Sequence, residues 1–226
     1  FFRIFFTFLH ASKFRGHTEQ SIQDFVERRR CFLLSRRTDL ALEAHELYRA
    51  AARGSAPRGL SCREYECDGC RATAVLVKDA EAAQALGKPE GRYITLDLRS
   101  LREQSADWSS QAAAAVAKEL RMLLPDGTES ALVVGLGNRA MTPDIIGPES
   151  ARHILATRHL RRLDVFSSLA CVSVLTPGVL GQTGLEAAEL VRGAVKAVGP
   201  DVVIAVDALC AQHLGRVCTT VQLSDT

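Results

Sequence analysis

The stretch that decides the fold is Val133-Val134-Gly135-Leu136-Gly137-Asn138, followed closely by Thr142-Pro143-Asp144. It begins as an apolar strand pattern and breaks at two glycines into a loop that carries a carboxylate. A second apolar run, residues 202–206, ends directly in Asp207. Parallel strands end at one edge of a sheet, and open α/β sheets bind their ligands at that edge. Asp144 and Asp207 are therefore predicted to form an acid–base pair there.

Strand and helix patterns alternate on both sides of this stretch. A helix is expected to begin near Asp39, and residues 54–69, rich in Gly, Ser and Cys, are expected to form a loop. Strands are expected at 72–77, 93–98, 131–135, 171–175, 202–206 and 217–222, and helices at 80–86, 106–124, 149–160, 184–198 and 208–214. Apolar strands that alternate with helices predict an α/β fold of the phosphorylase/hydrolase-like type, with a mostly parallel sheet and helices on both faces.

Two helices have more specific signals. Residues 106–124 form a strongly amphipathic pattern, with Ala113, Val116, Leu120 and Leu123/Leu124 on the apolar face. The helix at 184–198 opens with the capping-box pattern Thr183-x-x-Glu186. Both helices are therefore expected to pack on the sheet.

The composition excludes several classes of protein. A formal net charge of +2 gives no global field for nucleic acid or a membrane, and the arginines at 28–30 and 36–37 are interpreted as solvated surface. The apolar opening, residues 1–9, is far too short to cross a membrane as a helix. We therefore expect no membrane and no direct nucleic-acid partner.

The chain has seven cysteines, an odd number that favours reduced thiols over a disulfide framework. Cys62, Cys67 and Cys70 form a C-x4-C-x2-C cluster that suggests zinc. A structural zinc site needs four ligands, and the sequence offers no fourth ligand nearby. We predict no metal and no cofactor.

Each aspartate also has a purely structural interpretation. Asp144 can cap the helix expected near Pro148 or stabilise a turn, and Asp207 can cap the helix expected after it. The catalytic alternative treats them together. Two close carboxyl groups cannot both ionise cheaply, so one keeps its proton while the other acts as a base on water.

A second loop, residues 176–184, follows a neighbouring strand and contains no charged residue. Its glycines can let an extended peptide backbone approach closely, although a plain structural loop explains the pattern equally well. The candidate substrate-binding residues of the two loops are Gly137, Asn138, Pro177, Gly178, Gly181 and Thr183. The pattern Gly135-x-Gly137-x-x-Ala140 also fits a dinucleotide-binding turn, but Pro143 intervenes before any helix can begin.

Several segments resemble the germination protease family, the spore endopeptidases of endospore-forming bacteria. The resemblance runs in order from about residue 37 to the last residue. It rests on RTDLALEA (37–44), GRYITL (91–96), VVGLGN (133–138), TPDIIGP (142–148), TRHL (157–160), PGVLGQTG (177–184), IAVDAL (204–209) and TTVQLSDT (219–226). The family is similar in fold to hydrogenase-maturation proteases.

The resemblance implies an endopeptidase that degrades small acid-soluble spore proteins early in germination, in the cytoplasm of the spore core. The family's catalytic aspartates fall on Asp144 and Asp207. It implies a self-processing zymogen with a propeptide-like segment, 1–39, dispensable for folding, a peptidase domain, 40–226, and a cut between Asp39 and Leu40. It also implies a homotetramer, and a family pattern that continues beyond Thr226, so that the domain is expected to be incomplete at its carboxyl end.

Two alternatives remain open. One is a metal-dependent protease of the maturation type, with Asp144 and Asp207 as ligands and His159 or His213 as a third. The other is an inactive homologue that only binds peptide or assembles.

Overall fold

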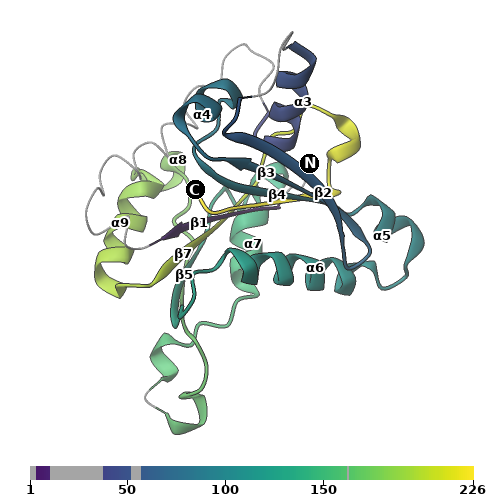
Figure 1. The fold of residues 1–226 in the computed structure, drawn as a ribbon. Coiled ribbons are helices and arrows are strands. Elements are labelled where there is room, and N and C mark those ends of the chain that lie inside the picture. Colours follow the sequence, from purple (N-terminus) through teal and green to yellow (C-terminus); the bar gives the residue numbers. More distant parts are fainter. Residues whose placement is uncertain (1–3, 11–37, 52–56, 162) are drawn as a thin grey trace.

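The computed structural model of the chain describes residues 4–10, 38–51, 57–161 and 163–226 (Figure 1). In this part of the chain, one sheet has the strand order β2-β3-β4-β8-β1-β7-β5-β6. The strands are β1 (Ile4–His10), β2 (Leu60–Cys67), β3 (Cys70–Val77), β4 (Gly91–Asp97), β5 (Ser130–Gly135), β6 (Cys171–Leu175), β7 (Val202–Asp207) and β8 (Thr220–Ser224). The α/β class is thus confirmed.

The predicted mostly parallel sheet is not confirmed. The pairs β8–β1, β7–β5 and β5–β6 are parallel, whereas β1–β7, β2–β3, β3–β4 and β4–β8 are antiparallel. The reason is clearest at β2 and β3, which are joined by only Asp68 and Gly69, both with positive φ. Such a two-residue turn forces an antiparallel hairpin. The parallel strands β6, β5 and β7 lie around the stretch that carries Asp144.

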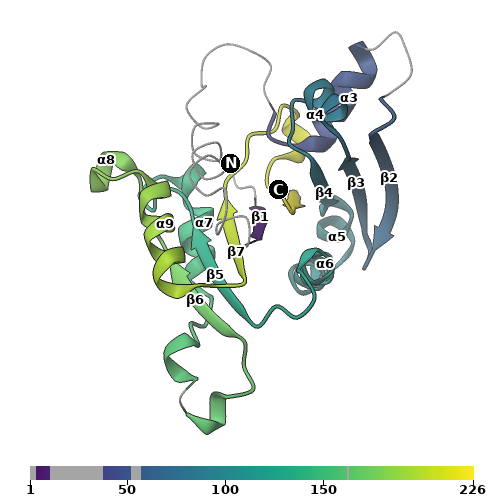
Figure 2. The same ribbon diagram turned by 60° about the vertical axis from the view of Figure 1, so that its left-hand side comes forward.

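Helices cover both faces of the sheet (Figure 2). On the half formed by β2, β3 and β4, α3 (Ala41–Ala51) and α4 (Ala80–Leu86) pack on one face, and α5 (Arg99–Gln104) and α6 (Trp108–Leu123) on the other. Successive side chains of β4 point to opposite faces of the sheet. Tyr93 therefore packs in the apolar cluster under α3 and α4, and Leu96 in the cluster under α5 and α6. At the other half, α9 (Ala187–Val198) packs on Leu132 and Val134 of β5.

The helix α7 (Ile146–Arg152) lies on the opposite face of β5 from α9. A Cβ added at Gly135 would lie 2.3 Å from the carbonyl oxygen of Gly147 and 2.9 Å from the Cβ of Ala151. Small residues at these positions therefore let α7 lie directly against the end of the strand. The single turn α8 (Leu180–Thr183) follows β6.

Some predicted elements differ from those observed. β2 forms inside the expected loop 54–69. The sequence did not indicate this strand, because most of its side chains are exposed and lack the apolar pattern of a buried strand. The helix expected at 149–160 ends at Arg152 and is followed by 3-10 turns, including Arg158–Leu160. The segment 208–214 does not form a helix, and a single 3-10 turn, Leu214–Arg216, precedes β8.

Two helix details also differ. On α6 the expected Leu123 is buried and Val116 and Leu120 pack against the core, but Ala113 is exposed. The other buried positions are Ala112, Ala115 and Glu119, so the buried face includes a carboxylate. The capping box of α9 uses Glu186 and Glu189, because the helix begins three residues later than expected.

The strand β1 lies between β7 and β8, although residues 1–39 were predicted to be dispensable for folding. Its backbone pairs with both neighbours, while residues 11–37 of the same segment lie outside the described part. In the described uncut chain this strand therefore belongs to the sheet. No helix among the described residues is both long and apolar enough to span a membrane.

Candidate active site

The candidate site lies where β5 and β7 end side by side. Gly135 pairs with Val206 in the parallel ladder, and the N–H of Leu136 donates to the Val206 carbonyl at 2.8 Å. A Cβ at Gly147 would lie 2.1 Å from the Leu136 oxygen and 2.4 Å from the Val206 oxygen. The start of α7 therefore lies directly against both strand ends. The loop that carries Asp144 and the segment that begins at Asp207 leave the sheet at this same edge.

Asp144 is half-buried at the end of a 3-10 turn, Thr142–Asp144. Its Oδ2 accepts the N–H of Asn138 at 2.7 Å, which fixes the carboxylate over the glycine turn. Gly137 has a φ of 128°, and a Cβ there would lie 2.1 Å from the Asp144 carbonyl oxygen. Only glycine fits this close approach. The N-cap of α7 is Ile145, without a side-chain cap, so that Asp144 does not cap this helix.

Asp207 is the last residue of β7 and is 7% exposed. Its Oδ1 accepts the N–H of Ala208 at 2.7 Å. The helix that it was expected to cap is not formed. Asp207 is therefore held in place by its position at the end of a buried strand and not by a role as a helix cap.

A side-chain hydrogen bond connects the second predicted loop to the first. Gln182 donates from Nε2 to Oδ1 of Asn138 at 2.9 Å, and the same oxygen accepts the N–H of Ala140 at 2.9 Å. The structure thus brings Gly137, Asn138 and Asp144 together, and it places the loop after β6 beside them. Of the four residues predicted in this loop, Pro177 is buried, Gly178 has a φ of 75°, and Gly181 and Thr183 are exposed.

Apolar side chains stand exposed on both loops. Met141 is 54%, Leu180 48% and Leu185 46% exposed. The Asn138–Gln182 hydrogen bond joins the loop that carries Met141 to the loop that carries Leu180. Exposed apolar side chains on these loops can contact apolar side chains of a peptide.

The third ligands of the metal alternative are not gathered at the aspartates. His159 and His213 are both exposed, in a 3-10 turn and in the segment after β7. Across the described ranges, no group of three or more His, Cys, Asp or Glu side chains is placed to hold a metal ion.

Of the three clustered cysteines, Cys67 and Cys70 pair across the β2–β3 hairpin, whereas Cys62 lies opposite Val75. Cys62 is exposed, whereas Cys67 and Cys70 are buried on either side of the β2–β3 turn. Burial raises the pKa of Cys67 to about 12 and that of Cys70 to about 11. These two thiols therefore stay protonated at neutral pH, as structural cysteines do.

The predicted processing residues contact the segment that follows Asp207. The N–H of Asp39 donates to the Cys210 carbonyl at 2.8 Å, and the N–H of Cys210 donates to Oδ2 of Asp39 at 2.6 Å. Lys88 donates to the Asp39 carbonyl at 3.0 Å, and Leu40 is 1% exposed. The structure thus links the predicted cut to the segment that begins at one of the predicted catalytic residues.

Sequence reasoning missed three residues that shape this region: Gly147, Gln182 and Glu43. Gly147 had a signal, since a glycine between apolar residues and a proline often marks a close approach. Gln182 had none, because a polar residue in a polar loop is unremarkable by itself. Glu43 is buried in the first turn of α3, three residues after the buried Leu40, and such burial is unusual for an acidic residue.

Sequence comparisons with known proteins identify relatives of this chain. The sequence model of the germination protease family matches residues 41–226. A germination protease of Caldanaerobacter subterraneus is 42% identical over 200 residues, which cover 86% of this chain and 60% of that protein. Those of Priestia megaterium and Clostridium tetani are 39% and 36% identical, over 84% and 85% of this chain and 54% and 61% of their own lengths.

The chain thus spans a little over half the length of these relatives. The matched range includes both strand ends, both loops and the segment after β7. By this match the chain belongs to the germination protease family.

Proposed function

We propose that the chain carries the active site of an endopeptidase that degrades small acid-soluble spore proteins during germination, with Asp144 and Asp207 as its acid–base pair. The observation that carries this proposal is that β5 and β7 end side by side, with Asp207 at the end of β7 and Asp144 in the loop that leaves the end of β5. The family membership supports a peptidase.

The chemistry needs one ionised and one protonated carboxyl group. The ionised group takes a proton from water, whose oxygen attacks the scissile carbonyl carbon, while the protonated group donates its proton to the carbonyl oxygen. When the C–N bond breaks, the leaving nitrogen receives the proton taken from water. The proton on the former carbonyl oxygen returns to the second carboxyl group, so that both aspartates regain their starting states.

The two loops are proposed to bind the peptide. Gly137, Asn138, Pro177, Gly178, Gly181 and Thr183 are the proposed contact residues. The absence of charge from residues 176–184 and the exposed side chains of Leu180 and Leu185 support contact with a neutral, partly apolar peptide segment.

The protein is further proposed to be a zymogen that is cut between Asp39 and Leu40. The contacts between Asp39 and Cys210 support this proposal, because they link the cut to the segment that starts at Asp207. Removal of Asp39 would change how that segment is held.

A homotetramer in the spore core is proposed as the working form. The segment between α7 and β6 projects away from the sheet (Figures 1 and 2). It carries exposed apolar side chains, namely Ile154, Leu155, Leu163, Val165 and Leu169. Exposed apolar side chains gathered on a projecting segment are typical of an interface between subunits.

The test uses the complete natural protein and a purified small acid-soluble spore protein. We expect cleavage whose rate changes by less than about twofold in excess chelator and follows a bell-shaped pH profile, because one acid and one base are needed together. Loss of cleavage on chelation, restored only by a divalent metal, would contradict the paired-carboxylate mechanism. Absence of any cleavage would favour a homologue that only binds peptide.

A further inference from the structure

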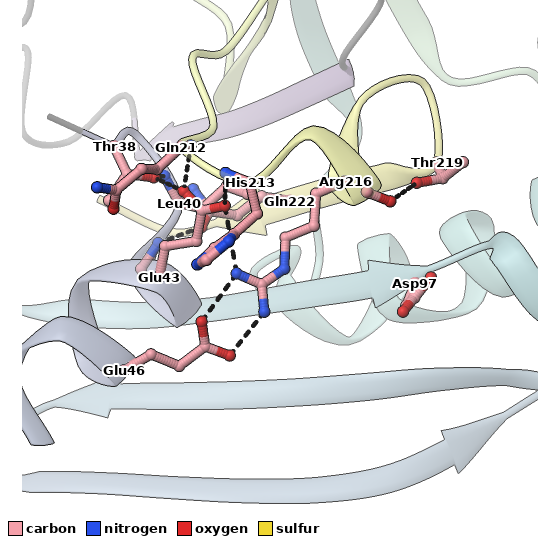
Figure 3. A network of polar contacts seen from close by, with 12 residues as sticks. Thr38, Leu40, Glu43, Glu46, Asp97, Gln212, His213, Arg216, Thr219 and Gln222 are labelled. Atoms are coloured by element: carbon pink, nitrogen blue, oxygen red, sulfur yellow. Dashed lines mark hydrogen bonds and ion pairs between the residues drawn. The ribbon is translucent and has the colours of Figure 1, made fainter. Parts of the chain in front are cut away.

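A buried carboxylate on α3 organises the segment that follows Asp207 (Figure 3). Glu43 is 1% exposed and accepts the N–H of Gln212 at 2.7 Å and that of His213 at 3.0 Å. Nη1 of Arg216 lies 3.2 Å from Oε1 of the same carboxylate. One side chain thus contacts three positions between β7 and β8. Without a helix in this segment, Glu43 supplies the polar partners that its backbone needs.

A single hydroxyl group, that of Thr38, connects this carboxylate to the backbone nitrogen of Leu40. Thr38 donates its hydroxyl to Oε2 of Glu43, and the N–H of Leu40 donates to that hydroxyl oxygen at 3.1 Å. Thr38 therefore bridges the backbone nitrogen at the predicted cut and the buried acid.

Hydrolysis at this point would change the bridge. Water adds across the bond between the Asp39 carbonyl carbon and the Leu40 nitrogen, which leaves a carboxylate on Asp39 and an amine on Leu40. The amine takes up a proton and becomes an ammonium group. Thr38 lies on the other side of the cut, so that its hydroxyl is no longer tied to Leu40 through the chain.

The local charge favours an ammonium group at this place. Arg216 binds Glu46 at 2.6 and 2.9 Å as well as Glu43, so that two carboxylates share one guanidinium. Lys88 donates to the carbonyls of Thr38 and Asp39, at 3.1 and 3.0 Å. Its positive charge opposes a second cation nearby.

Two further titratable groups belong to the segments that Glu43 connects. The Asp39 carboxylate is held by the Cys210 N–H, and the exposed His213 follows in the same segment. A cut after Asp39 separates its carboxylate from α3, whereas Glu43 stays one turn from the new amine. Glu43 is then the acid closest in sequence to the Leu40 amine on α3.

We propose that, in the processed protein, the α-ammonium group of Leu40 replaces the Thr38 hydroxyl as the partner of Glu43. Glu43 is then a positioning residue, which couples the new amino terminus to the segment that begins at Asp207. This inference rests on the proposed cut between Asp39 and Leu40.

The experiment introduces a site for a sequence-specific protease into the complete protein, so that cleavage leaves Leu40 as the first residue. A matched version leaves one glycine before Leu40. The probe is acetic anhydride, and mass spectrometry measures acetylation of the terminal amine as a function of pH. This readout does not depend on catalytic activity.

The Leu40 amine is expected to titrate above the usual α-amino range of about 7.7–8.0, and to react at least about tenfold more slowly at pH 8 than in the glycine-extended form. Glu43→Gln should restore ordinary titration and reactivity. Glu46→Gln is the matched control, because Glu46 pairs with the same Arg216, whereas the Thr38 hydroxyl that receives the Leu40 N–H binds Glu43, so this substitution should leave the amine protected. If the glycine-extended form and the Leu40 form titrate alike, the ion pair is wrong, even where Glu43→Gln fails to fold.

Amino-terminal sequencing of the naturally processed protein separates this inference from the proposed function. A natural cut elsewhere would refute processing at Asp39–Leu40, while the engineered cut still tests the ion pair. Where the ion pair forms, the glycine-extended form should show a kcat at least about tenfold lower with little change in KM, and activity should fall as pH rises through the pKa of the Leu40 amine. An unchanged kcat would refute the positioning role of Glu43.

Discussion

At the scale of single residues, hydrogen bonds affect the pKa of Glu43 more than burial does. Burial by itself would raise the pKa of this carboxyl group, but the N–H groups of Gln212 and His213, the Thr38 hydroxyl and the Arg216 guanidinium together hold it below its usual value of 4.5. All four partners favour the ionised form. The carboxylate therefore stabilises the folded protein when it is charged.

This lowered pKa gives a pH-dependent stability. The folded pKa of Glu43 is lower than the unfolded one, so the contribution is complete above pH 4.5 and is lost as pH falls through the folded pKa. Glu43→Gln should lower the free energy of unfolding by about 3 kcal/mol at pH 7, because it breaks a buried ion pair. Urea unfolding at pH 7 and at stepwise lower pH should show this difference shrinking below pH 4.5.

Glu46→Gln is the matched control, since the Glu46 side chain is 44% exposed and its pair with Arg216 is correspondingly screened. This substitution should lower the free energy of unfolding by less than about 1 kcal/mol. A Glu43→Gln difference that stays constant from pH 7 to pH 3 would show that the charge of Glu43 does not stabilise the fold.

At the scale of elements, the turn after β5 depends on a glycine that a side chain cannot replace. Gly137→Ala would place a Cβ 2.1 Å from the Asp144 carbonyl oxygen at a φ of 128°. We expect a loss of about 2–4 kcal/mol of stability, through strain and overlap. Because the displaced backbone carries Asp144, cleavage should also fall by about a hundredfold.

The control is Gly181→Ala in the second loop, where an added Cβ meets nothing within 4 Å. It should change stability by less than about 0.5 kcal/mol. Equal effects of the two substitutions on urea unfolding would mean that the close approach of Gly137 and Asp144 is not important for the fold.

The elements that could be predicted from the sequence are those in which consecutive apolar residues indicate burial. The apolar runs 131–135 and 202–206 predicted β5 and β7, and with them the edge where Asp144 and Asp207 lie. β2 was missed because its exposed charged residues resemble a loop, although Asp68-Gly69 is a hairpin signal. The expected helix at 208–214 failed because Asp39 and Glu43, about 170 residues earlier in the chain, bind its backbone.

At the scale of the whole molecule, the strand order joins distant parts of the chain. β8 and β1 lie between β4 and β7, an arrangement that depends on pairings between residues such as Phe5 and Gln222. Local patterns carry no information on such pairings, so that the mixed sheet was not predicted. The shared sheet edge of Asp144 and Asp207, by contrast, could be predicted from two neighbouring parallel strands alone.

The projecting segment between α7 and β6 gives a prediction about assembly. Val165 is 84% exposed there, and Val165→Asp should weaken the proposed tetramer, because a subunit interface would have to bury the new charge. Sedimentation of the complete protein should show a dissociation constant at least about tenfold higher.

Met122→Asp is the control, since Met122 is 65% exposed on α6, away from this segment. It should leave the assembly unchanged. If Val165→Asp also leaves the assembly unchanged, this segment is not the interface.

The central claim is that Asp144 and Asp207 act together in peptide hydrolysis. The most direct measurement is the rate at which the complete protein cleaves a small acid-soluble spore protein when either residue is changed to asparagine. We predict that Asp144→Asn and Asp207→Asn each lower this rate by at least about a thousandfold, with unchanged urea unfolding. The control is Asp126, an exposed carboxylate that precedes the opposite end of β5. Asp126→Asn should keep the rate within about twofold of that of the unsubstituted protein. Cleavage within about tenfold of the unsubstituted protein for either variant at the site would contradict the claim.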